Sequence, residues 1–127
     1  MFLGLRKNPQ SAVEKICHHI KNNKTINIGS KKTARRYIHV NDVAKGVYSS
    51  IGREKNEVFN LSGSSLTSLG KIIKICEKTN NKKIKIYQTN KDKPSIRNIL
   101  NSKAKKKLNW KPFLALEKEI AKLNKLY

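Results

Sequence analysis

Arg36 is the residue whose type and position most directly suggest binding chemistry. It stands at the head of an expected strand, in the segment RRYIHVNDVA. A planar guanidinium at the rim of a cleft can donate two parallel hydrogen bonds to a phosphate or a carboxylate. The sequence therefore makes Arg36 a candidate anchor for an anionic ligand.

The strand that begins at Arg36 is expected to run directly into a helix. Asn41 and Asp42 belong to the residue types that cap helix N-termini, and apolar residues recur at helical spacing behind them. The segment predicts a short βα junction, with a strand near Arg36–Val40 and a helix near Asp42–Ile51.

Three segments, taken in their order and spacing, resemble one enzyme family. They are RRYIHVNDVA at 35–44, EVFNLSGSSLTSLGKIIKI at 57–75 and DKPSIRNILNSKAKKKLNWKP at 92–112. All three resemble motifs of the extended short-chain dehydrogenase/reductases, the NAD-dependent nucleotide-sugar epimerases and dehydratases. The resemblance runs from about Gly4 to the end of the chain.

The resemblance implies an α/β fold, namely the C-terminal substrate-binding part of such an enzyme without most of its Rossmann domain. Residues 1–127 would form a single partial domain. The ligand would be a nucleotide-diphosphate sugar, with Arg36 and Arg97 contacting phosphate oxygens and Asn60 contacting the nucleotide. One departure from the family is Leu100, which takes a place where relatives usually carry an acidic partner for the second arginine.

Two features of the complete enzymes are missing from the sequence. None of the six glycines forms the Gly-rich turn that holds a dinucleotide between a strand and a helix. The family's Tyr-x-x-x-Lys pair is also missing, because Tyr87 and Lys91 lie in a polar, turn-rich stretch where no helix is expected to align them. We therefore expect no catalytic residue and no bound cofactor in this chain. It would be inactive alone, and NAD would be held by the complete enzyme.

The opening segment Met1–Val13 resembles the part just after the family's catalytic region, so a separate NAD-binding half or a homo-oligomer is an expected partner.

The composition fits one small domain. The chain has 127 residues, of which 37% are hydrophobic, enough for a core. No apolar run approaches the roughly 18 residues of a membrane span, and the N-terminus lacks a signal-peptide pattern. The sequence predicts a cytoplasmic protein without a membrane partner.

The net charge of +21 supports an alternative function, that of a small basic nucleic-acid-binding protein. The positive charge is spread over the whole chain, however, and only five of the 29 basic residues are arginines. Lysine, asparagine and isoleucine are all abundant, and their codons are all rich in A and T. A drift in the base composition of the coding sequence would therefore explain the abundance of all three residues. The densest basic run, at 103–111, holds one aromatic residue, which is little for base stacking. A third alternative is a non-catalytic remnant of the enzyme.

Neither the cysteines nor the histidines predict a metal site. Cys17 and Cys76 fall on apolar positions of expected helices, and buried free thiols are favoured over a disulfide or a metal ligand. His18 and His19 are adjacent, so a helix would direct them about 100° apart. His39 alternates with apolar residues and is expected to be a hydrogen-bonded structural residue.

The pattern of apolar and turn residues predicts alternating helices and strands. Helices are expected near 11–22, 42–51, 67–79, 102–109 and 114–126, and strands near 25–28, 36–40, 57–61 and 83–87. Either Thr67 or Ser68 should cap the third helix. The resemblance implies that an apolar surface normally packs on the NAD-binding domain; its residues would be Val43, Val47, Ile51, Val58, Phe59 and Leu61.

Overall fold

The structure is a computed structural model that describes residues 2–4, 7–22, 25–53 and 56–126. Met1, Leu5 and Arg6 of the opening segment therefore lie outside the described residues. Helices and short strands alternate along the chain. The helices are α1 (Ala12–Asn22), α2 (Val40–Ser50), α3 (Leu69–Asn80), α4 (Ser102–Leu108) and α5 (Leu116–Leu126). The strands are β1 (Phe2–Leu3), β2 (Thr25–Ile28), β3 (Ala34–Arg35), β4 (Ile38–His39), β5 (Thr67–Ser68), β6 (Lys85–Gln88) and β7 (Ile96–Arg97).

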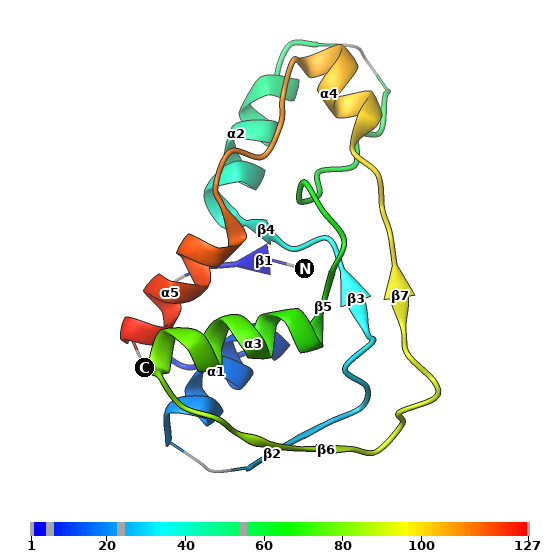
Figure 1. Ribbon diagram of the computed structural model, residues 1–127. Coiled ribbons are helices and arrows are strands. Elements are labelled where there is room, and N and C mark those ends of the chain that lie inside the picture. The colour runs from blue at the N-terminus through cyan, green and yellow to red at the C-terminus, as the bar shows by residue number, and fades with distance from the viewer. Residues whose placement is uncertain (1, 5–6, 23–24, 54–55, 127) are drawn as a thin grey trace.

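The helices gather at the two ends of an elongated body (Figure 1). Helices α1, α3 and α5 pack on one another at one end, and α2 packs on α4 at the other. Small sheets lie between and below these groups: β1 runs parallel to β4, and β2 runs parallel to β6. In the third sheet, β3 is central, antiparallel to β5 and parallel to β7.

Each helical group surrounds its own apolar core. The larger core lies among α1, α3 and α5, and its members include Val13, Ile20, Ile72, Ile73 and Ile120. The smaller core joins α4 to β4 and consists of Ile38, Ala104, Leu108 and Trp110, with Val43, Phe59 and Leu61 packed against it. Burial of such side chains contributes about 1.5–3 kcal/mol each, so these two cores hold the α/β framework together.

Side-chain caps explain where two of the helices begin. Ser11 Oγ accepts a hydrogen bond from the Glu14 backbone N–H at 3.2 Å, and Glu14 Oε2 accepts one from the Ser11 N–H at 3.0 Å. This reciprocal pair is a capping box at the start of α1. Ser68 Oγ accepts from the Lys71 N–H at 3.2 Å and caps α3, as the sequence predicted.

The five expected helices and the strands at β2 and β6 are confirmed, with shifted ends. The strand expected at 36–40 shortens to β4, because the helix α2 already begins at Val40, with His39 as its N-cap in place of Asn41 or Asp42. The strand expected at 57–61 is wrong. That segment is irregular, and two of its apolar side chains pack on the smaller core instead of on a sheet partner.

The described helices are too short or too polar to cross a lipid bilayer.

Candidate functional site

The predicted anchor Arg36 lies between β3 and β4, beside the loop at residues 62–65. Its Nε donates to Asn98 Oδ1 at 2.6 Å, and its Nη1 donates to the carbonyl oxygens of Gly63 at 3.0 Å and Ser64 at 2.7 Å. Arg36 thereby ties the loop to the segment that follows β7. These bonds occupy two of its three nitrogens, and Nη2 makes no hydrogen bond to another of the described residues.

Arg97 ends β7 and is followed by Asn98, the residue whose Oδ1 accepts from Arg36 Nε. In the parallel β3–β7 pair its register partner is Arg35. The Arg97 side chain is exposed, whereas Arg35 is half-buried and donates from Nη2 to Ser95 Oγ at 2.9 Å. Within the described part of the chain, no ion pair neutralises any of these three arginines, which lie in or next to β3 and β7.

Sequence reasoning passed over Arg35, although the arginine doublet at 35–36 was a visible signal. Leu100, at the place where relatives usually carry an acidic residue, is 56% exposed. An apolar side chain there offers no carboxylate to Arg97. The Arg97 guanidinium therefore has no acidic partner at that position.

Asn60, the third predicted binding residue, lies on the irregular segment that leads into the 62–65 loop. Its side chain is exposed and makes no hydrogen bond to the other residues that the structure describes. The loop behind it is firmly held: Ser62 Oγ donates to the Ile99 carbonyl at 2.7 Å, and Asn101 Nδ2 donates to the Ser62 carbonyl at 2.8 Å. Asn60 thus lies two residues before a loop that is held in place by hydrogen bonds to the segment after β7.

Gly63 allows this loop to approach the β3–β4 connection. A Cβ atom at residue 63 would stand 1.8 Å from the carbonyl oxygen of Tyr37, far inside contact distance. Tyr37 is itself a core residue, 5% exposed, and burial raises the pKa of its phenol. The loop therefore rests on backbone that cannot move aside easily.

Asp42 has a different role from the helix cap that the sequence suggested. It is 1% exposed, and its carboxylate oxygens each accept one backbone N–H, from Phe113 and from Leu114, at 3.2 Å. Its carbonyl oxygen accepts from Trp110 Nε1 at 3.0 Å. Asp42 fastens the segment that leads into α5 onto α2, which is a structural function.

His39 is hydrogen-bonded, as the sequence predicted. Nδ1 accepts from the Asn41 backbone N–H at 3.1 Å, and Nε2 lies 3.4 Å from Glu119 Oε2. The adjacent cavity has a volume of about 20 Å³, the size of a water site and too small for a ligand.

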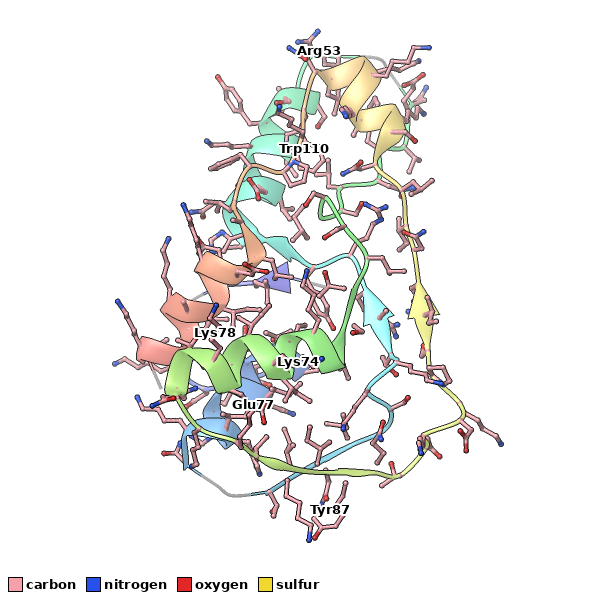
Figure 2. The ribbon with its side chains drawn as sticks, in the orientation of Figure 1. Arg53, Lys74, Glu77, Lys78, Tyr87 and Trp110 are labelled. Carbon is pink, nitrogen blue, oxygen red and sulfur yellow. The ribbon has the colours of Figure 1, made fainter. Side chains whose placement is uncertain are left out.

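A larger hollow of about 440 Å³ lies between the ends of α2 and α4, lined by Gly52, Arg53, Phe59, Lys107 and Leu108. Figure 2 places Arg53 at the tip of the molecule, away from β3 and β7. Across the described residues, no group of three or more histidine, cysteine or acidic side chains could hold a metal ion. Arg36, Asn60 and Arg97 stay the predicted contacts for an anionic ligand.

The comparison with family models found no match. Among curated proteins, the UDP-glucuronate 4-epimerase of Thermodesulfobacterium geofontis (strain OPF15) is 31% identical over 118 residues. This alignment covers 90% of the chain but 36% of that epimerase.

Solved structures share the fold. UDP-glucose 4-epimerase from Thermotoga maritima, solved with UDP-glucose, matches 98% of the chain with a TM-score of 0.84 and 21% identity. The dTDP-glucose 4,6-dehydratase from Bacillus anthracis, solved in complex with NAD, matches 100% of the chain with a TM-score of 0.85 and 15% identity. In each case the chain covers 42% of the solved protein.

The chain thus spans well under half the length of the proteins that it matches. Its α/β fold is that of part of an extended short-chain dehydrogenase/reductase, as the three sequence segments predicted. In sequence the chain is similar to part of a UDP-glucuronate 4-epimerase, and in fold it is similar to part of solved nucleotide-sugar epimerases and dehydratases.

Proposed function

We propose that the chain is the substrate-binding portion of an NAD-dependent nucleotide-sugar epimerase or dehydratase. The observation that carries this proposal is the side chain of Arg97 on β7, which is exposed and without an ionic partner among the described residues, opposite Arg35 in the β3–β7 pair. A diphosphate offers the charge and the oxygen geometry that guanidinium groups bind best.

Each of the three residues has a proposed role. Arg97 contacts phosphate oxygens with its exposed guanidinium. Arg36 contacts them through Nη2 while its other nitrogens hold the 62–65 loop, and Asn60 contacts the nucleotide from that loop. The relative from Thermotoga maritima was solved with UDP-glucose, which supports a UDP-sugar as the ligand class.

The cofactor would be held elsewhere. We propose that residues 1–127 form one partial domain, that NAD belongs to the complete enzyme, and that the chain alone is inactive. A separate NAD-binding half or a second copy of the chain would be its partner, and a cytoplasmic location stays a prediction from the sequence.

Calorimetry on the purified 127-residue chain tests this function. We expect UDP to bind at moderate salt, while the protein retains no NAD and turns over no nucleotide sugar. Stoichiometric NAD after purification, or epimerase activity above a blank, would contradict the inactive-alone part. No UDP binding at millimolar concentration would contradict the substrate-binding part.

The net charge of +21 favours one second candidate, nucleic-acid binding. In that case many lysines would contribute similarly, and affinity would fall steeply with salt. A UDP site built on a few arginines would respond mainly to the loss of those arginines.

A further inference from the structure

The two cysteines meet in the larger core, although 59 residues separate them in sequence. Cys17 lies on the buried face of α1 and Cys76 on that of α3, and their sulfur atoms are 3.1 Å apart. Both residues are free thiols with 0% exposure. The sequence predicted buried free thiols, but it did not predict that they touch.

We propose that Cys17 and Cys76 form a reversible disulfide that locks α1 onto α3 when a low-molecular-weight disulfide oxidises them. The bond would require the sulfur atoms to approach by about 1 Å, from 3.1 Å to the usual length of about 2.0 Å. A shift of this size between two packed helices is small. A metal site is a poorer use of the pair, since no third ligand completes a cluster among the described residues.

The chemistry is a two-step thiol–disulfide exchange. One cysteine thiolate attacks the oxidant, which forms a mixed disulfide and releases one small thiol. The second cysteine then attacks the cysteine sulfur of the mixed disulfide, which forms the intrachain bond and releases the second small thiol. The two protons lost by the cysteines end on the two released thiols, so two cysteine thiols are oxidised and one external disulfide is reduced.

Burial decides the rate of the first step. The hydrogen bond with Cys76, and then burial, raise the pKa of the Cys17 thiol far above its usual range, so the closed protein holds little reactive thiolate. The oxidant can reach a sulfur only when α1 and α3 separate transiently. As the helices come back together, the second cysteine meets the cysteine sulfur of the mixed disulfide and displaces the small thiol, which favours the intrachain bond over a lasting mixed disulfide.

The test is oxidation of the 127-residue chain with excess oxidised glutathione, a few degrees below its melting temperature. We expect both thiols to disappear together, with a mass lower by two hydrogens and no glutathione adduct. The melting temperature of the oxidised monomer should rise by at least about 5 °C, because the bond closes a long loop, and dithiothreitol should reverse the rise.

Cys17→Ala and Cys76→Ala are the matched controls, since each leaves one thiol that cannot form the intrachain bond. Neither variant should gain thermal stability on oxidation. The proposal is overturned if the wild-type chain keeps both thiols, accumulates glutathione adducts or linked dimers, or melts at the same or a lower temperature after oxidation. These readings on the wild-type chain decide the proposal even if a variant does not fold.

Discussion

Replacing Gly63 with alanine is expected to destabilise the loop on which the candidate site depends. The new Cβ would lie 1.8 Å from the Tyr37 carbonyl oxygen and 2.8 Å from its carbonyl carbon. Both atoms are backbone, so no side-chain rotation relieves the clash. Ordinary contact begins near 3.4 Å, and the loop must therefore move away from Tyr37 by more than 1 Å.

The magnitude follows from the contacts that such a movement disturbs. The Gly63 carbonyl would withdraw from Arg36 Nη1, and Ser62 would be pulled from its bonds with Ile99 and Asn101. Losing two or three hydrogen bonds at roughly 0.5–1.5 kcal/mol each, together with residual overpacking, gives about 2–4 kcal/mol. The lower entropy of an unfolded chain with alanine returns only about 0.4–1 kcal/mol.

Urea unfolding followed by circular dichroism measures this change, and Gly29→Ala is the matched control. A Cβ at residue 29 meets no atom within 4 Å, so that variant should unfold within about 1 kcal/mol of the wild type. If the Gly63→Ala and Gly29→Ala chains have free energies of unfolding within about 0.5 kcal/mol of each other, the close packing of the loop on Tyr37 is refuted.

Three further predictions concern stability and association. Asp42→Asn should lower the free energy of unfolding in urea by about 1.5–3 kcal/mol, because the N–H group of Phe113 or Leu114 would then face an amide NH₂ in place of a carboxylate oxygen. An unchanged urea midpoint would show that the Asp42 carboxylate does not anchor this segment. The hydrogen bond from Lys107 lowers the pKa of Glu57, so the Glu57 carboxylate stabilises the fold above about pH 4.5 and this contribution is lost as the pH falls through the lowered pKa. Melting temperatures between pH 5 and pH 3 should fall less for Glu57→Gln than for the wild type, and equal slopes would count against the pair. Ile51→Lys should reduce self-association in sedimentation velocity without lowering the melting temperature, because Ile51, the C-cap residue of α2, is an apolar side chain that is 71% exposed. A wild-type chain that is already monomeric at high concentration would contradict this.

The helices could be predicted from the sequence because their buried faces repeat at helical spacing. In α3, Leu69, Ile72, Ile73 and Cys76 all face the larger core. The two-residue strands β1, β5 and β7 could not be predicted, since two residues are too few to show the alternation of a strand. Their partners are set by the packing of distant segments.

The segment at 57–61 shows why an apolar pattern can mislead. Phe59 and Leu61 look like one face of a strand, but they pack against Leu108 and Trp110 without joining a sheet. The predicted exposed surface is wrong for these two side chains and for Val43, which also packs against the smaller core. Val58, however, is 79% exposed, as predicted.

The sequence could predict which residues belong to the candidate site, but it could not predict how they are arranged. The arginines and Asn60 could be named from motifs, and their place relative to one another depends on the β3–β7 pairing and the 62–65 loop. The holding bonds of Arg36 to Gly63 and Ser64 join residues 27 and 28 positions apart, which no local pattern reveals.

Calorimetric titration of UDP at moderate salt, with the Arg97→Ala and Lys105→Ala chains beside the wild type, tests the central claim most directly. Both side chains are exposed cations, so they differ in position more than in charge. If the β3–β7 edge binds a diphosphate, loss of Arg97 should weaken UDP binding by about 1.5–3 kcal/mol, roughly 10-fold to 150-fold, while loss of Lys105 should change it little. Equal weakening by the two substitutions, with affinity falling steeply as salt rises, would show that UDP responds only to the overall positive charge and would contradict a nucleotide-sugar site.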